Sequence, residues 1–262
     1  MRRTFSAAIA LTVGAALLAG CASGPRKPTS RQIARIERAL SSAPGAAQPS
    51  TIVATEIAFA RMARDEGQWT AFTHFAAEEG VLHGENGPIA AKPWLAQQSN
   101  PPKPVQWGPR TVWMSCDATL AISQGRFRDP EGKVGIFNTV WERQGDGTYR
   151  YLYDGGALDN PQPPPPPAGE EDEEVIVVTA LDTVRGEVAD CSEPGNPLPA
   201  APFASASTGA ESGGTRSGDG SLVWQWRQGA NGSRQFRSFI WQGGEWQEAA
   251  SFDFGARAGD AE

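Results

Sequence analysis

Histidine, cysteine and long apolar runs are all scarce in this sequence, and their scarcity excludes several classes of protein. The 262 residues include only two His and three Cys, and none of them has the spacing of a metal site. There is no His-Glu-x-x-His sequence, calcium loop, phosphate-binding glycine loop or serine nucleophile elbow. We therefore expect neither a metal nor a cofactor.

Basic residues are also outnumbered. The chain has 23 Lys and Arg against 30 Asp and Glu, which is a formal net charge of −7. Without Arg2 and Arg3 the balance is 21 basic to 30 acidic residues, or −9. An acidic protein without a basic stripe is poorly suited to phosphate backbones, so we expect no nucleic-acid partner.

The first 20 residues have the pattern of an export signal. Two arginines precede an apolar run, Ala7 to Leu18, which is too short to span a bilayer comfortably. Leu18-Ala19-Gly20-Cys21 then resembles the bacterial lipobox. The resemblance implies that Cys21 becomes a lipidated N-terminus and attaches the protein to a membrane. Because Ala22 follows the cysteine, the resemblance favours an outer-membrane lipoprotein facing the periplasm. A transmembrane anchor and a secreted protein with a chance cysteine are the alternatives.

Lipidation of Cys21 would leave two cysteines, Cys116 and Cys191, in an oxidising compartment. A disulfide between them would close a loop of 75 residues. The chain-entropy model gives such a bridge roughly 4 kcal/mol. We expect the disulfide; the alternative is two separately buried thiols.

The order of the expected elements predicts an α+β domain over residues 51–156, after a tether at 21–50. Helical periodicity is found mainly in the first part of this region, and strand periodicity follows it. Helices are expected at 51–66, 69–77 and 91–98, a brief strand at 81–83, and four antiparallel strands over 106–154. Helices gathered before an antiparallel sheet are typical of α+β folds. We expect the sheet to curve into a cone around the helices and to leave a cavity.

The second half of the chain predicts a β-rich extension. Residues 157–174 form a proline-rich, acidic linker, and residues 175–262 hold the extension. Strands are expected at 175–179, 221–228, 234–242 and 245–254, with a mobile Gly/Ser loop near 204–220. A few strands alone are marginal. We therefore expect this meander to pack on the first domain, held by the Cys116–Cys191 bridge; an independent tail module is the alternative.

Three stretches of the first domain carry a family resemblance. They are Thr55-Glu56-Ile57-Ala58-Phe59-Ala60, Gly87 leading to Trp94-Leu95, and Thr139 to Asp154 with its Gly-Asp-Gly turn. Together they resemble the nuclear transport factor 2-like superfamily, the SnoaL-like or ketosteroid-isomerase-like cone, and in particular its small exported bacterial members. The resemblance covers about a hundred residues. It implies a pocketed cone, but the superfamily contains isomerases, dehydratases, cyclases and members without activity, so fold alone does not give function.

Three residues are candidates for acid–base chemistry. In this superfamily isomerase chemistry needs a carboxylate base in an apolar cavity, opposite a hydrogen-bond donor. His83 and Asp154 are expected near the rim of the cone, and Glu56 lies on the apolar side of the first helix. Each has a structural alternative: a hydrogen-bonded histidine, an aspartate that caps a turn, and a glutamate paired with an arginine or with backbone donors.

Aromatic residues are candidates for the pocket wall, where they would suit a flat apolar ligand. They are Trp69, Phe72, Trp94, Trp113, Trp141 and Tyr153. The alternative is that they fill the core and touch no ligand.

Three functions fit these expectations. The first is a lipid-anchored periplasmic protein that binds a small ligand or acts as an accessory protein. The second is an isomerase or lyase that acts on an apolar small molecule through His83 or Asp154. The third is an envelope interaction protein that uses the C-terminal meander as its contact surface. A homodimer is left open.

Overall fold

The computed structural model describes residues 46–164, 183–191, 197–203 and 210–254. The signal sequence, Cys21, most of the tether, most of the acidic linker and the strand expected at 175–179 lie outside the described residues. None of the helices in the described ranges is long and apolar enough to cross a membrane.

Three helices form the first part of the described chain: α2 (Pro49–Asp65), α3 (Gln68–Phe75) and α4 (Ala91–Leu95). Helix α2 buries Ile52, Glu56, Phe59 and Ala63, the stripe that the helical spacing predicts. It begins slightly earlier than expected because Pro49, whose φ suits the first turn, belongs to the helix. Helix α3 ends earlier than expected because Ala76 is already extended.

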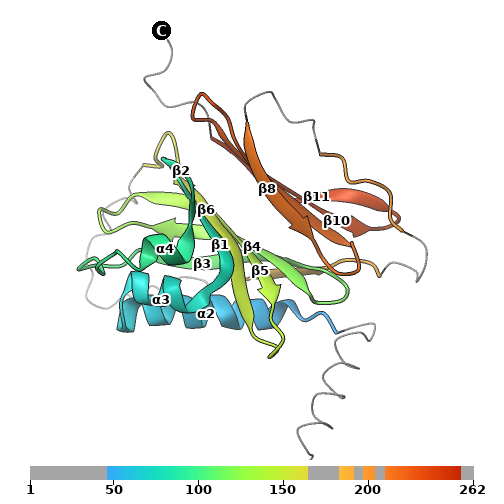
Figure 1. The fold of residues 1–262 in the computed structure, drawn as a ribbon, viewed down its shortest axis with the longest axis horizontal. Helices are drawn as coiled ribbons and strands as arrows, with labels where there is room; N and C mark the ends of the chain where they lie inside the picture. Colours follow the sequence, from blue (N-terminus) through green and yellow to red (C-terminus); the bar gives the residue numbers. More distant parts are fainter. Residues whose placement is uncertain (1–45, 165–182, 192–196, 204–209, 255–262) are drawn as a thin grey trace, which may run out of the picture. The chain divides into compact units, whose positions relative to one another are not determined.

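Seven strands form a curved sheet that packs against these helices, with α2 and α3 below it in the view of Figure 1. The sheet order is β2-β1-β6-β5-β4-β3-β7, in which β1 pairs with β6 and β7 with β3 in parallel, and all other pairs are antiparallel. The strands are β1 (Ala76–Gly84), β2 (Gly87–Ala90), β3 (Gln106–Met114), β4 (Leu120–Arg128), β5 (Val134–Arg143), β6 (Tyr149–Leu158) and β7 (Arg185–Val188). The predicted α+β class and the predicted antiparallel meander β3-β4-β5-β6 are confirmed.

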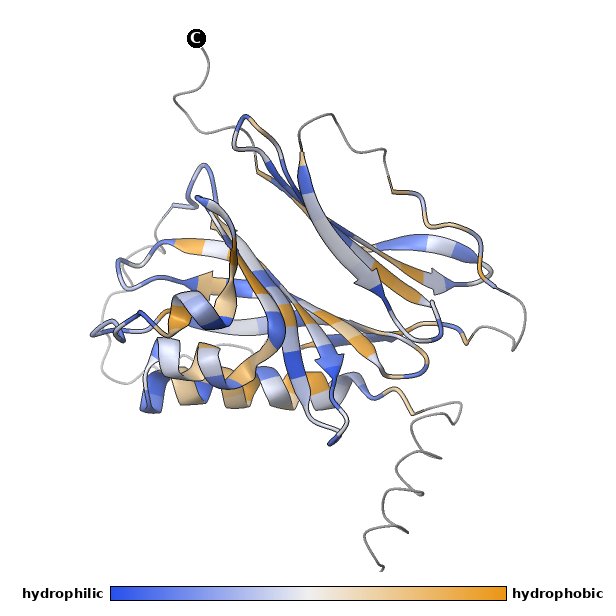
Figure 2. Cartoon of the chain, viewed as in Figure 1, coloured by the Kyte–Doolittle hydropathy of each residue, from blue (hydrophilic) through white to orange (hydrophobic). Residues whose placement is uncertain are grey.

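The helices lie on one face of this sheet and bury an apolar core against it (Figure 2). Phe59 of α2 is at the centre of that core. Its ring centroid lies 4.8 Å from those of Phe72, Phe75 and Trp107. Aromatic contacts of this kind add to the free energy of apolar burial. We call the helix-covered side of the sheet its concave face.

A second sheet of four strands follows, in the order β11-β10-β9-β8. Its strands are β8 (Glu211–Arg216), β9 (Leu222–Gln228), β10 (Arg234–Gln242) and β11 (Glu245–Phe254). Strand β8 lies where we expected a mobile loop, so that prediction was wrong for residues 211–216. A Cβ on Gly213 would lie 2.6 Å from the Trp226 ring, and one on Gly214 would lie 2.2 Å from the Trp224 carbonyl oxygen. The glycines that suggested a loop are therefore what lets β8 approach β9.

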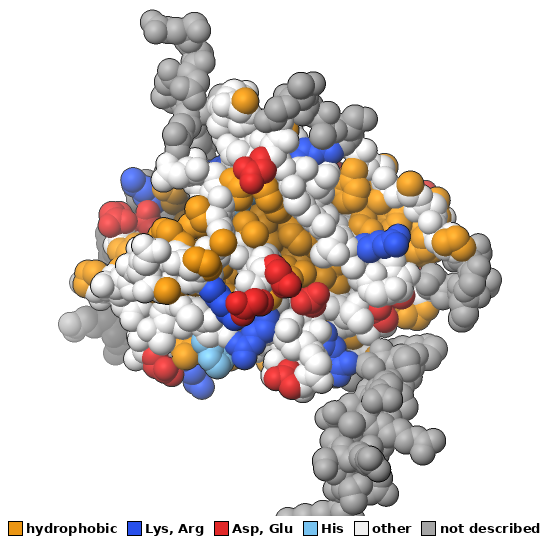
Figure 3. Space-filling model, in the orientation of Figure 1, with side chains coloured by type: hydrophobic (Ala, Val, Ile, Leu, Met, Phe, Trp, Pro, Cys, Tyr) orange, Lys and Arg blue, Asp and Glu red, His pale blue; other side chains and the backbone are white. Residues whose placement is uncertain are grey.

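The four-stranded sheet covers the other face of the seven-stranded sheet. Trp224, Trp226 and Phe236 pack there with Ile122 and Tyr153 in a second apolar core. The aromatic face of the meander is thus internal, and it is not available as the contact surface of an envelope interaction protein. Figure 3 shows one face of the molecule, where hydrophobic side chains gather toward the middle with acidic and basic side chains among and below them.

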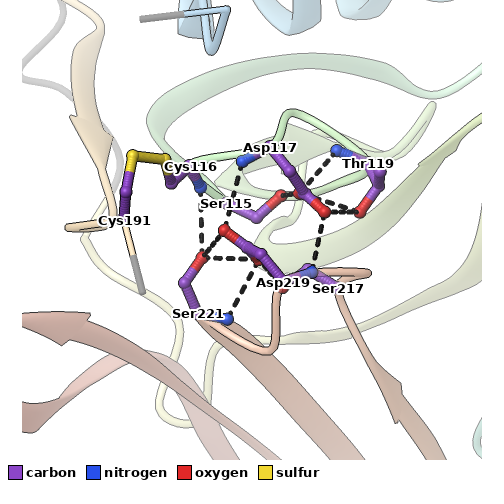
Figure 4. Close-up of a disulfide and its surroundings, with 8 residues drawn as sticks. All are labelled: Ser115, Cys116, Asp117, Thr119, Cys191, Ser217, Asp219 and Ser221. Carbon is purple, nitrogen blue, oxygen red and sulfur yellow. Dashed lines mark hydrogen bonds between the residues drawn. A yellow bond between two sulfur atoms is a disulfide. The ribbon is translucent and has the colours of Figure 1, made fainter. Parts of the chain in front are cut away.

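Two similar turns join the sheets at one point (Figure 4). Both have the sequence Ser-x-Asp-x-Ser/Thr-Leu, at residues 115–120 and 217–222. Their hydrogen bonds are reciprocal: the Asp117 N–H donates to Asp219 Oδ2 at 3.2 Å, and the Asp219 N–H donates to Asp117 Oδ2 at 2.8 Å. In each turn the leading serine also donates to its own aspartate at 2.7 Å. We call this pair of turns the clasp.

The predicted disulfide is confirmed and lies at the clasp. Cys116 is bonded to Cys191 across 75 residues, with their Cα atoms 5.1 Å apart. The Cys116 N–H also donates to Ser221 Oγ at 3.1 Å. The disulfide itself ties the β3–β4 turn to the segment after β7, and both belong to the seven-stranded sheet. The hydrogen bonds of the clasp, and not the disulfide, join the two sheets here, so the expectation that the bridge fastens the meander was wrong.

Candidate functional site

A row of polar side chains crosses the concave face. Ser123 on β4 lies opposite Thr139 on β5, and Thr139 lies opposite Asp154 on β6. Residues paired in register point to the same face of a sheet. The Thr139 hydroxyl donates to Asp154 Oδ2 at 2.7 Å. Three neighbouring strands thus present hydroxyl, hydroxyl and carboxylate side by side beneath the helices.

Glu56 of α2 meets this row from the helical side, where it is completely buried. The Ser123 hydroxyl donates to Glu56 Oε1 at 2.5 Å. The indole N–H groups of Trp141 and Trp107 donate to Oε1 and Oε2 at 3.2 and 3.1 Å. Neither an arginine nor a backbone donor holds this carboxyl; a serine and two tryptophans do.

Burial raises the pKa of Glu56 to about 7, the donated hydrogen bond from Ser123 opposes that rise, and the nearby charge of Asp154 adds to it. A carboxyl without a basic partner in an apolar site favours its neutral form. Near neutral pH the protonated and ionised forms of Glu56 are therefore both populated. The carboxyl lies inside the protein core.

Asp154 is the polar group of the row that reaches open space. Its side chain is partly buried and borders a cavity on the concave face. Burial raises the pKa of Asp154 to about 6, against the opposing hydrogen bond from Thr139. Asp154 was expected near the cavity mouth as a candidate base, and the structure places it in the cavity wall.

The cavity has a volume of about 400 Å³ and an aromatic wall. That size lies within the usual range of small-molecule sites. A second hollow of about 390 Å³ adjoins it and shares Gln68, Trp69 and Asp154 with it. The aromatic residues of the main cavity are Trp69, Phe72, Trp107, Phe127 and Phe137.

The six aromatic residues proposed for the pocket fall into three groups. Trp69 and Phe72 line the main cavity, and Trp94 lines the adjoining hollow. Trp141 is completely buried beneath the cavity, where it holds Glu56 and Ser123. Trp113 and Tyr153 belong to the apolar core between the sheets. Strand alternation explains this last group, because neighbouring residues of a strand point to opposite faces.

Gln68 is a site residue that the sequence analysis missed. Its Oε1 accepts the backbone N–H of Val105 at 2.9 Å, which fixes the orientation of the amide. Its Nε2 has no hydrogen-bond partner among the described residues. The residue borders both hollows together with Asp154. The position at the start of α3, directly after Gly67, was the only available signal, and it does not indicate a function.

His83 does not line the main cavity, although it borders the adjoining hollow together with Asp154. It is 2% exposed and lies between the sheets, where Nδ1 is 3.1 Å from the Tyr153 hydroxyl and Nε2 is 2.9 Å from Gln228 Oε1. Register explains the separation: Leu82 pairs with Asp154, and His83 pairs with Gly155. Burial lowers the pKa of His83, so its neutral form is favoured. The structure thus shows the hydrogen-bonded histidine that was the alternative for this position.

The arrangement provides a hydrogen-bond acceptor and a donor in an apolar enclosure. Asp154 can accept a hydrogen bond or a proton, and the Gln68 amide can donate one. Across the described residues no three His, Cys, Asp or Glu side chains are grouped as a metal ion would require.

Comparisons with known proteins find similarity to solved structures only. No family model matches the chain, and no curated protein matches it. A candidate ketosteroid isomerase from Parabacteroides distasonis is 14% identical with a TM-score of 0.35, over 46% of this chain and 94% of that one. Nuclear transport factor 2 from Cryptosporidium parvum is 14% identical with a TM-score of 0.33, over 43% and 95%. A nuclear transport factor 2-like superfamily protein from Salmonella enterica is 12% identical with a TM-score of 0.32, over 51% and 98%. Similarities of this size do not identify a function.

Proposed function

We propose that this protein binds a small, flat, predominantly apolar molecule in the cavity on the concave face. The observation that carries the proposal is the wall itself: five aromatic rings around one carboxylate and one amide that has an unused donor. Apolar cavities with a few convergent polar groups are the usual form of small-molecule sites. The rings would supply the contact area, and Asp154 and Gln68 would orient the ligand.

A filling substitution tests this proposal directly. A Cβ on Gly84, which borders both hollows, would have no atom within 4 Å, so the Gly84→Phe ring can enter the space without a clash at its base. Gly145 has the same open surroundings but lies in the β5–β6 turn, outside the cavity, and Gly145→Phe is the matched control.

The probe is the neutral fluorophore Nile red, titrated into the purified protein. We expect Gly84→Phe to weaken its binding at least tenfold and Gly145→Phe to leave it unchanged. Equal binding by both variants would place the probe elsewhere and contradict the proposal. Mass spectrometry of molecules that copurify with the unsubstituted protein would then identify the natural ligand.

Asp154 and Gln68 together favour a second candidate function, an isomerase that moves a proton. Asp154 would take a proton from the carbon next to a carbonyl group, and the Gln68 amide would donate to the resulting enolate oxygen. Return of the proton to another carbon of the same molecule completes the reaction, with no change in oxidation state. A base with a pKa near 6 suits such a transfer.

Deuterium exchange measures that step even when isomerisation is slow. We expect the protein to catalyse exchange from D₂O next to the carbonyl of a bicyclic β,γ-unsaturated ketone, at a rate that rises with pH through about 6. Asp154→Asn should lower the rate by about two orders of magnitude or more. Binding of the ketone without exchange in either protein would reject catalysis and leave the binding function standing.

We also propose that the protein works as an outer-membrane lipoprotein facing the periplasm, attached through Cys21. The support is the Leu18-Ala19-Gly20-Cys21 sequence followed by Ala22. In a bacterial host the full chain should yield a mature N-terminus at Cys21 with the mass of its acyl chains. It should also sediment with outer membranes. Cys21→Ala should remain unprocessed, and processing of that variant at the same site would contradict lipidation.

A further inference from the structure

The outer side of α2 forms one wall of a groove that is separate from the cavity. Residues 103–109 and the turn between β4 and β5 complete it, with a volume of about 680 Å³. Four basic residues border it, Arg61, Arg64, Lys103 and Arg128, and they outnumber the two acidic residues of its lining, Glu56 and Asp129. Its apolar lining includes Ile57, Ala60 and Pro104. We call this the basic groove.

Two features of the basic groove indicate that something covers it. Ile57 is 58% exposed and is one of two large hydrophobic side chains that are exposed among the described residues. Arg61 and Lys103 lie within salt-bridge distance of no described carboxylate, although the charge of Arg61 acts on Asp65; Arg64 is paired with Asp65 at 2.8 Å. In a chain of net charge −7, unpaired basic groups beside an exposed apolar side chain suit an acidic occupant with apolar neighbours.

The chain itself contains such a segment between residues 164 and 183. Residues 170–174 are Glu-Glu-Asp-Glu-Glu, and Val175-Ile176-Val177-Val178 follows directly. Five adjacent carboxylates repel one another, and basic partners relieve that repulsion.

On both sides of this segment the described chain is attached to strands that reach the basic groove, although neither attachment point lines it. On the near side, Gln162 is hydrogen-bonded to the backbone N–H and carbonyl of Val134, both at 2.9 Å, where β5 leaves the β4–β5 turn. On the far side, β7 pairs with Thr111–Met114 of β3, the strand whose first residues line the groove. Residues 165–182 therefore connect these two attachment points.

We propose that the acidic run Glu170–Glu174 docks in the basic groove of its own chain. Trp107 and Val105 line both the groove and the cavity. The docked run would contact the outer side of the wall whose inner side faces the ligand. The proposal stands independently of what the cavity binds.

Zero-length carbodiimide cross-linking of the full-length chain, purified in detergent, tests this contact. The reagent joins a lysine amine to a carboxylate only when the two touch. Lys103 lies in the groove, whereas Lys133 lies near Gln162, where the segment departs, and would be the preferred partner of an undocked run. We expect links from Lys103 to residues 170–174 within monomers, at low salt, to exceed those from Lys133 at least fivefold.

Two variants separate docking from chance proximity. Arg61→Glu keeps every cross-linkable lysine, so we expect it to reduce the Lys103 links at least fivefold through charge alone. Lys103→Arg keeps the charge and should abolish these links without increasing those to Lys133. Links that favour Lys133, or that are unaffected by Arg61→Glu, would overturn the proposal. Links found only between two chains would also overturn it, because the groove would then receive a second copy.

Discussion

The buried carboxyl of Glu56 makes stability depend on pH in a direction that can be stated in advance. Its pKa is about 7 in the folded protein, against an ordinary value of 4.5. Because the folded value is the higher one, the folded state holds the proton more tightly than the unfolded chain. The stabilisation is therefore complete below pH 4.5 and is lost as the pH rises through about 7.

The magnitude follows from the same two values. Between them the folded state binds one proton more than the unfolded state, so the free energy of unfolding falls by about 1.4 kcal/mol per pH unit. The whole shift corresponds to about 3 kcal/mol.

The assay compares the natural chain with Glu56→Gln by urea unfolding at several values between pH 4 and pH 8. The amide cannot titrate, so the difference in stability between the two proteins should fall by about 3 kcal/mol over that range. The amide also replaces one accepting oxygen by an NH₂ group, which cannot accept the hydrogen bond of Trp107 or those of Trp141 and Ser123. That cost is the same at every pH. The prediction therefore concerns how the stability difference between the two proteins changes with pH, and not its value at any one pH.

A stability difference that stays constant from pH 5 to pH 8 would show that the pKa of Glu56 is not raised in the folded protein. A further comparison in the Asp154→Asn background separates the causes. The Asp154 charge contributes to the raised pKa of Glu56. Removing that charge should therefore lower the pH at which the stability difference stops falling. If the pH range of the fall is unchanged, burial alone raises the pKa of Glu56.

Three further perturbations test the fold. Cys191→Ser opens the 75-residue loop and should cost about 2–4 kcal/mol, measured as a lower urea midpoint under oxidising conditions. Asp219→Ala leaves the Asp117 N–H and the groups of its own turn without their acceptor and should cost about 2 kcal/mol. Gly125→Ala would place a Cβ 2.1 Å from a backbone oxygen, so we expect a lower melting temperature. Gly84→Ala meets no atom within 4 Å and should change the melting temperature far less.

Helices and strands that bury only one of their faces could be predicted from local patterns in the sequence. The stripe of Ile52, Glu56, Phe59 and Ala63 is visible in the sequence because helical spacing depends only on residues a few positions apart. Strand β5 was predicted as part of the meander because alternation and a glycine-rich turn are also local signals. Strand β8 was missed because its glycines have the composition of a loop, and their close approach to Trp224 and Trp226 of β9 is visible only in the structure.

Periodicity along the chain was enough to predict the α+β class and the antiparallel meander. The Cys116–Cys191 bridge was expected only on the assumption that Cys21 is lipidated, and the structure contains the bridge. Only the tertiary structure decided which chemical groups meet. Leu82, and not His83, pairs with Asp154. Asp154 therefore faces the cavity, and the side chain of His83 points to the space between the sheets. Burial by residues up to 85 positions away sets the proton affinity of Glu56. Such effects depend on three-dimensional proximity and solvent exclusion, which no local pattern records.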